Sequence, residues 1–136
     1  MPLISRKGIL AVTAVIDIAI HGRTRPVSAK TLAARHKLPP RHLEPVLQAL
    51  VRDGILRGIR GPHGGYALAR EEKHITADDI MRAAVSAEMA AEPPLPPSAL
   101  IGKVVRPALA AAEESFADAH ATINLEDLAK AAEELN

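Results

Sequence analysis

The sequence predicts a mainly α-helical protein with one small β-hairpin, and three observations support this prediction. Apolar residues recur at helical spacing in most segments of the 136-residue chain. Two short runs, ILRGIR and YALAR, flank the glycine-rich segment 61–65, which is typical of a hairpin. Hydrophobic residues make up 48% of the chain, which is enough for a packed core.

A first helix is expected over residues 5–21, and Gly22 ends it. Apolar residues share one face of this helix: Ile9, Val12, Ile16 and Ile20. The apolar run 8–16 is interrupted by Asp17, lacks a following cleavage pattern and is too short to span a bilayer. We therefore expect a buried helix of a cytoplasmic protein that has no membrane partner.

Two short helices joined by a tight turn come next. Ser28 is a favoured N-cap residue for a helix through SAKTLAARH, which the KLPP turn ends because proline has no backbone N–H. Pro40 can open the following helix, and Gly54 ends it. Its apolar residues follow the spacing i, i+3, i+4, i+7 and i+8: Leu43, Val46, Leu47, Leu50 and Val51. This arrangement is typical of a helix-turn-helix.

Adding the β-hairpin to this helix pair makes a winged helix-turn-helix, which we expect over residues 1–86. Near the end of this domain, Thr76 and Asp79 resemble a capping box for a helix that ends near Met89. Residues 87–98 are expected to form a proline-rich linker. The remaining domain, 99–136, contains a long helix capped by Ser98 and a short last helix capped by Asn124.

Two prolines fall inside these expected helices. An interior proline costs roughly 3 kcal/mol unless it lies in the first turn. Pro45 therefore predicts that the second helix of the pair either begins later than Pro40 or has a distorted first turn. Pro107 predicts that the long helix is kinked or that its start is delayed.

Charge is distributed unevenly along the chain. Residues 1–75 carry 13 Lys and Arg and 5 Asp and Glu, a net charge of +8, whereas residues 76–136 carry 4 and 11, a net charge of −7. A basic segment of this kind favours a polyanionic partner. Tyr66 and Phe116 are the only aromatic residues, which argues against a stacking platform for single-stranded nucleic acid.

The hairpin has a physical role if the partner is double-stranded DNA. The start of the second helix of the pair would enter the major groove, and the hairpin would lie beside the neighbouring backbone. Gly61 and Gly64 let the backbone approach a phosphate, Arg57 supplies charge, and Arg60 can enter a minor groove. A plain tight hairpin remains the alternative interpretation, since glycine and proline are the usual turn residues.

Several segments together resemble the Rrf-two (Rrf2) family of bacterial transcription regulators. They are PRHLEPVLQALVRDGIL, RGPHGGYALAR and ITADDIMRA, extended by SRKGILAVTAVIDIAIHG at the start and INLEDLAKA near the end. The most specific of them is the R-G-P-x-G-G-Y pattern at residues 60–66. The family includes the iron–sulfur regulators IscR, NsrR and RirA and the cluster-free CymR. The resemblance implies a homodimer in which a long C-terminal helix, here about residues 99–119, crosses its partner.

The resemblance also implies which residues contact DNA. The contacts at the start of the recognition helix would be Pro40, Arg41, His42 and Glu44. Arg41 can pair with guanine O6 and N7, and Glu44 can accept from cytosine N4. Phosphate contacts would come from the start of the preceding helix: Ser28, Lys30 and Thr31. His63 departs from the family pattern, because it replaces a glycine often found at the wing tip, and it either stiffens the tip or adds a phosphate donor. The dimerisation stripe of the long helix comprises Ile101, Val104, Val105, Ala108, Leu109, Ala112 and Phe116.

The sensing function departs from the family pattern. Cluster-binding members carry three cysteines near the start of the dimerisation helix, whereas this chain has no cysteine. A cysteine-ligated cluster is therefore excluded, and we expect no metal site and no cofactor. The sequence leaves open whether a small ligand or a partner protein provides control.

These observations favour a dimeric, sequence-specific DNA-binding regulator, a repressor that binds an inverted repeat. The alternative is a winged-helix protein–protein interaction module, or a regulator controlled by a partner protein, because fold alone does not determine function. An enzyme is not expected, since no phosphate loop or histidine–carboxylate pair occurs at recognisable spacing.

Overall fold

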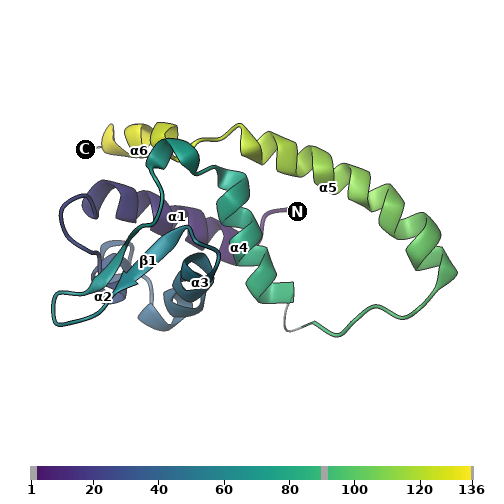
Figure 1. Ribbon diagram of the computed structural model, residues 1–136, viewed down its shortest axis with the longest axis horizontal. Helices are drawn as coiled ribbons and strands as arrows, with labels where there is room; N and C mark the ends of the chain where they lie inside the picture. Colours follow the sequence, from purple (N-terminus) through teal and green to yellow (C-terminus); the bar gives the residue numbers. More distant parts are fainter. Residues whose placement is uncertain (1–2, 90–91, 136) are drawn as a thin grey trace.

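The computed structural model describes residues 3–89 and 92–135 and shows helices with one two-stranded antiparallel hairpin (Figure 1). The fold class predicted from the sequence is therefore confirmed. The helices are α1 (Arg6–His21), α2 (Ala29–Arg35), α3 (Pro40–Arg52), α4 (Ala77–Met89), α5 (Arg106–Ala121) and α6 (Leu125–Glu133). The strands are β1 (Leu56–Ile59) and β2 (Gly65–Leu68). A 3-10 turn, η1 (Glu72–His74), precedes α4, and a π-helical turn, η2 (Ile101–Val105), runs directly into α5.

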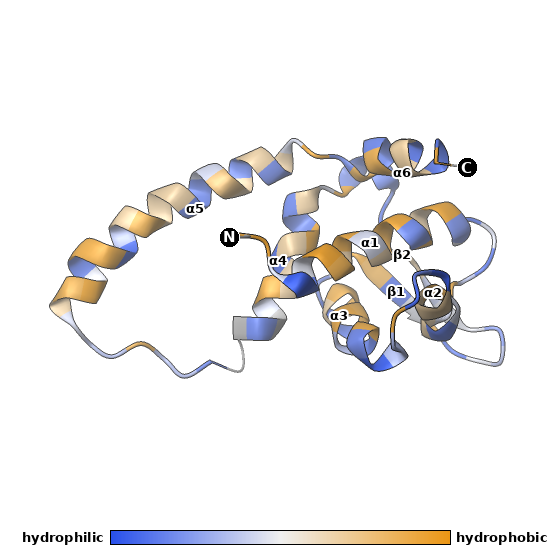
Figure 2. Cartoon of the chain, turned by 180° about the vertical axis from the view of Figure 1, so that it is seen from behind, coloured by the Kyte–Doolittle hydropathy of each residue, from blue (hydrophilic) through white to orange (hydrophobic). Residues whose placement is uncertain are grey.

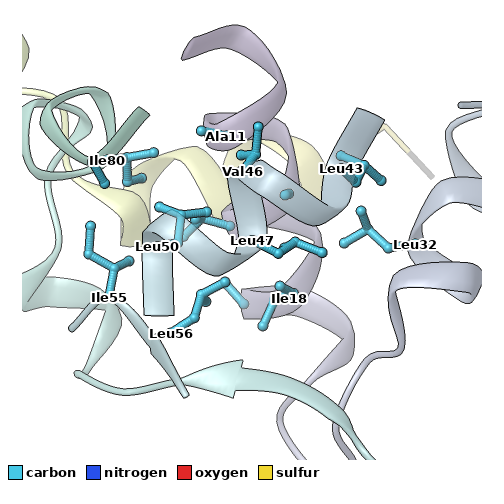
Figure 3. Close-up of a cluster of buried hydrophobic side chains, with 14 of the residues drawn as sticks. Ala11, Ile18, Leu32, Leu43, Val46, Leu47, Leu50, Ile55, Leu56 and Ile80 are labelled. Carbon is cyan, nitrogen blue, oxygen red and sulfur yellow. The ribbon is translucent and has the colours of Figure 1, made fainter. Parts of the chain in front are cut away.

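One apolar core joins α1 to the helix-turn-helix, the hairpin and α4 (Figure 3). Its largest fully buried side chains include Ile18, Leu32, Leu43, Leu47, Leu50, Ile55, Leu56 and Ile80. On α1 the buried face comprises Ala11, Ala14, Val15 and Ile18. The prediction that Ile9 lies on this face was wrong, because its side chain is 55% exposed. Alanines at the centre of the face let α3 and α4 pack closely against α1.

Both helices of the helix-turn-helix begin where the sequence predicts. The Ser28 hydroxyl accepts a hydrogen bond from the Thr31 amide at 3.1 Å, and α3 begins at Pro40. The turn between the helices places Lys37 at a φ of 56°, in the left-handed region that usually favours glycine. The Leu38 amide then donates to the Ala33 carbonyl at 2.8 Å, which closes the turn.

The two interior prolines are accommodated in different ways. The Pro45 side of α3 is exposed, and the first turn of α3 is tightened by a 3.0 Å bond from the His42 amide to the Pro39 carbonyl. A later start of α3, one of the two expected outcomes, is therefore wrong. In the long helix the π turn of residues 101–105 ends two residues before Pro107, which is the second residue of α5. The altered bonding of this turn accommodates a residue that cannot donate to the carbonyl four positions earlier.

The predicted capping box at the start of α4 forms, with hydrogen bonds of 3.0 and 3.2 Å between Thr76 and Asp79.

The C-terminal helix α6 returns to the core. The amide of Leu125 donates to the Ile75 carbonyl at 2.9 Å, and both side chains are fully buried. The sequence grouped α6 with the segment 99–136, whereas the structure packs Leu125 among the side chains of the winged helix. The expected domain boundaries themselves remain a prediction.

A buried carboxylate joins α1 to α2. Asp17 is the only polar or charged residue in the buried class among the described residues. Its carboxylate accepts from Arg35 Nε at 2.7 Å and Nη2 at 3.3 Å, and its Oδ2 lies 2.6 Å from His36 Nε2. The side chains of Arg35 and His36 remain about one-third exposed. Asp17 therefore fixes the end of α2, where the turn to α3 begins.

Replacing Asp17 with asparagine is expected to lower the free energy of unfolding by about 2 kcal/mol, because hydrogen bonds to charged groups contribute roughly 1.5–3 kcal/mol each and Arg35 regains water. Urea denaturation measures this change. The control, Asp53→Asn, alters a carboxylate that is one-third exposed and 3.8 Å from Arg52, and a change of about 0.5 kcal/mol or less is expected. Equal effects of the two substitutions would show that Asp17 has no special structural role.

Candidate nucleic-acid interface

The residues predicted to contact DNA lie at the starts of α2 and α3 and on the hairpin. Each of them is exposed or half-buried. The α1–α2 loop, α2 and the hairpin tip gather at one end of the molecule, and the start of the long helix lies at the opposite end (Figures 1 and 2). Side chains from the α1–α2 loop, α2 and the hairpin tip thus share one surface. We take this surface together with the start of α3, the helix that follows α2, and call it the DNA face: residues 21–31, 40–44 and 57–64.

The start of α3 presents three polar side chains to solvent. Arg41, His42 and Glu44 are exposed, whereas Leu43 between them is 1% exposed and anchors this turn in the core. In the described part of the chain, none of the three forms an ion pair. Their donors and acceptors are therefore available to a partner.

The hairpin, which we call the wing, carries two cationic side chains. Arg57 lies on β1, opposite Ala67 in the strand register, and Arg60 follows the end of β1. Both are exposed. The tip is closed by a hydrogen bond from the Gly64 amide to the Gly61 carbonyl at 3.0 Å. A short closed tip keeps Arg60 near the strands instead of on a long flexible loop.

The wing is attached to the helix-turn-helix by a backbone bridge. Val27, just before α2, donates to the Tyr66 carbonyl at 2.9 Å, and the Tyr66 amide donates back to the Val27 carbonyl at 2.8 Å. Gly65 makes this approach possible. Its φ is 155°, and a Cβ atom there would lie 2.5 Å from the carbonyl carbon and oxygen of Val27. The wing and the start of α2 therefore form one framework.

The α1–α2 loop carries two arginines in different environments. Arg23 is held by Glu133 at 2.8 Å and Glu72 at 3.5 Å. The hydrogen bond and charge of Glu133, with smaller contributions from Glu72, raise the pKa of the Arg23 guanidinium above its usual value. Arg25 is exposed and has no ion pair within residues 3–89 and 92–135. Arg25 is thus the available cation of this loop.

Sequence analysis missed Arg25, and it also missed the role of Asp17 in fixing α2. The segment HGRTRP was recognised only as a cationic loop, because nothing local shows that Val27 pairs with β2. A single acidic residue in an otherwise apolar helix was the available signal for Asp17.

The dimerisation stripe predicted on the long helix is exposed along most of its length. Within the described residues, no α5 side chain is fully buried. Val104 is 57% exposed, Leu109 59% and Phe116 36%. Figure 2 shows the apolar colouring concentrated toward the start of this helix. An apolar row of this length is typical of a surface that another chain covers.

Comparisons with known proteins agree with the resemblance in the sequence. Residues 4–131 match the model of the family described as Rrf2, iron-dependent transcriptional regulator. The chain is 38% identical over 79 residues to the HTH-type transcriptional regulator CymR of Bacillus subtilis, which covers 58% of this chain and 57% of that protein. It is 32% identical over 80 residues to the HTH-type transcriptional regulator IscR of Xenorhabdus nematophila. This match covers 59% of this chain and 49% of that protein. The chain spans about half the length of these curated relatives.

Solved structures of similar proteins share the fold over nearly the whole chain. The structure of T. potens IscR has a TM-score of 0.73 and 32% sequence identity and covers 99% of this chain and 91% of its own. The structure of CymR, the global cysteine regulator of B. subtilis, has a TM-score of 0.68 and 30% identity and covers 96% and 98%. The long helix is therefore included in the match.

The iron named in the family description does not fit the residues of this chain. The sequence has no cysteine to ligate an iron–sulfur cluster. Within residues 3–89 and 92–135, no group of three or more His, Asp or Glu side chains is placed to hold a metal ion. Separately, none of the described helices combines the length and apolar character needed to cross a membrane.

Replacing Gly65 with alanine is expected to break the bridge to Val27, because the new Cβ atom would overlap the Val27 backbone. We expect a loss of about 1–3 kcal/mol in stability, the usual cost of strained backbone or a lost native conformation. Amide hydrogen exchange measures the bridge directly, and the amides of Val27 and Tyr66 should lose protection together. Gly58→Ala is the control, since a Cβ atom at Gly58 meets nothing within 4 Å. Unchanged protection in Gly65→Ala would contradict this assignment.

Proposed function

The chain belongs to the Rrf2 family of transcriptional regulators, and from this premise we propose that it is a sequence-specific, dimeric DNA-binding repressor. The observation that carries the proposal is the DNA face. The bridge between Val27 and Tyr66 holds a cationic wing at the start of α2. The next helix, α3, begins with exposed polar residues that form no ion pair within the described part of the chain. A recognition helix and a wing on one framework can contact a major groove and the neighbouring backbone together.

Specificity is assigned to the start of α3. Arg41 has the fork geometry to pair with guanine O6 and N7, and Glu44 can accept from cytosine N4. His42 contacts a base edge or a phosphate. Arg60 on the wing enters the adjacent minor groove, where the negative potential is strongest. Lys30 and Thr31 at the start of α2, with the wing tip, supply phosphate contacts that set the register of the protein on the duplex.

Dimerisation is assigned to the exposed stripe of the long helix. Val104 and Leu109 are more than half exposed, and the long helix that carries them begins far from the core. A second copy of the same helix would bury them through a symmetric interface. Two DNA faces related by a two-fold axis then match an inverted repeat with half-sites about one helical turn apart.

Repression follows from occupancy of a promoter by such a dimer. A protein bound across an inverted repeat excludes other proteins from the same duplex, and no catalytic chemistry is required. DNA binding also implies a cytoplasmic location in a bacterium. The effector is unassigned: the acidic second half of the chain, with its net charge of −7, is the surface that a controlling partner protein would contact.

The proposal is tested by selecting fragments of the genome with purified protein at about 150 mM salt, where purely electrostatic binding is already weak. Recovery of a shared inverted repeat is the expected result. Fragments without a common sequence would instead indicate a non-specific binder. Failure to recover DNA, repeated at low salt, would contradict DNA binding and favour the protein–protein module.

On the recovered operator, Arg41→Ala and Arg60→Ala are expected to have different effects. Loss of a bidentate base contact should cost about 1–3 kcal/mol and relax the preference for one base pair. Loss of Arg60 should weaken binding to many sequences and reduce the salt slope by roughly 0.9. Fluorescence anisotropy on the operator and its single-base variants measures both effects. The assignment of Arg41 fails if its variant retains the full base preference.

Replacing Val104 with glutamate is expected to shift the dimer to monomer, because a carboxylate would be buried in an apolar interface. Sedimentation velocity should show the dimer dissociation constant rising at least tenfold, which corresponds to ~1.4 kcal/mol. Leu135→Glu is the control, because Leu135 is 86% exposed and lies outside the stripe. A Val104→Glu protein that remains a dimer, with helical content unchanged, would place the interface elsewhere.

A further inference from the structure

A groove of about 740 Å³ opens between the wing tip and the start of α2. One wall is formed by Pro62, His63 and Gly64 of the wing. The opposite wall comes from the end of α1, the α1–α2 loop and α2, and its residues are His21, Arg25, Pro26, Val27, Ser28, Thr31 and Arg35. Apart from Arg35, the lining residues of the groove belong to the DNA face. His21, Arg25 and Arg35 were absent from the contacts expected from the sequence.

The ionisable side chains that line the groove are all basic. Two arginines and two histidines line it, and no Asp or Glu does. Arg35 is oriented by Asp17, which accepts from its Nε at 2.7 Å and therefore keeps its guanidinium in place. Arg25 has no carboxylate partner among the described residues. A concave surface with a free guanidinium and a second, oriented one is suited to a phosphate group.

The walls of the groove are held together by backbone contacts. Val27 and Tyr66 exchange two hydrogen bonds of 2.8 and 2.9 Å directly behind it. At Gly64 a Cβ atom would lie 2.1 Å from the Ile59 carbonyl oxygen, so the tip is folded tightly onto β1. The separation between Arg25 and the wing tip is therefore set before a ligand arrives, which lowers the entropic cost of binding.

We propose that this groove binds one backbone phosphate of the DNA duplex, with Arg25 as its principal cation. The inference rests on the proposed function and deepens it, since it assigns a contact that joins the wing to the α1–α2 loop. A DNA phosphate is favoured over a free anion because the groove is open and lies between the wing and the start of α2, both on the face that presents α3. His63 and His21 flank the phosphate, and Arg35 supports it from the side of α2.

The test compares wild type with Arg25→Ala, Arg25→Lys and the control Lys130→Ala. Lys130 lies on α6, outside the residues of the DNA face, and its side chain is 70% exposed, so its replacement removes one positive charge without altering a proposed DNA contact. Arg25→Ala should weaken operator binding about fivefold to tenfold and reduce the salt slope by roughly 0.9, whereas base preference stays unchanged. Arg25→Lys should restore the slope, and Lys130→Ala should match wild type.

A second arm identifies the phosphate. Operator duplexes in which a single phosphate is replaced by an uncharged methylphosphonate are bound to wild type and to Arg25→Ala. At one position in each half-site, the substitution should weaken wild-type binding, so that wild type and Arg25→Ala bind with equal affinity. If no position abolishes the difference between them, a specific phosphate contact is contradicted.

The remaining outcomes separate the two proposals. Wild type that binds no duplex would overturn both the proposed function and this site. If wild type and Arg25→Ala bind the operator with the same affinity and the same salt slope, this site alone would be overturned. A third outcome combines two results: micromolar inorganic phosphate shifts the NMR signals of the groove, and Arg25→Ala binds DNA normally. This outcome would overturn the DNA assignment and identify a free anion as the ligand.

Discussion

The two-way backbone bridge between Val27 and Tyr66 is the constraint on which the rest of the DNA face depends. A two-stranded hairpin alone in water is only marginally stable. This hairpin gains an additional backbone pairing, because Val27 forms an antiparallel bridge with Tyr66 of β2. Gly65 permits the approach, since a side chain there would overlap the Val27 backbone. The bridge sets the position of the wing relative to α2, and hence the relation of Arg60 to the start of α3.

Two further contacts extend this framework into the rest of the fold. Asp17 fixes the end of α2 against α1, although burying a carboxylate is costly unless it is paired. The Leu125 amide donates to the Ile75 carbonyl, which connects the end of the long helix to the segment following the wing. The wing is thus linked through η1 and α4 to the helix assigned to dimerisation.

Much of the fold could be predicted from the sequence because local patterns determine it. The caps at Ser28 and Asn124 and the capping box at Thr76 depend on nearby residues and form as predicted. Long-range contacts carry no such signal: neither the pairing of Val27 with β2 nor the return of α6 to the core is visible in a period of apolar residues. Arg25 was missed for this reason, because its position beside the wing tip follows from that pairing. The roles of the individual DNA contacts remain predictions.

An NMR titration of the ¹⁵N-labelled protein with its selected operator tests the central claim most directly. The account predicts that amides at the start of α3, the start of α2, the α1–α2 loop and the wing tip shift together at one protein-to-duplex ratio, because they belong to one rigid face. Amides of α6 should shift little. Shifts confined to α5 and α6, or shifts of the wing that saturate separately from those of α3, would contradict the single DNA face.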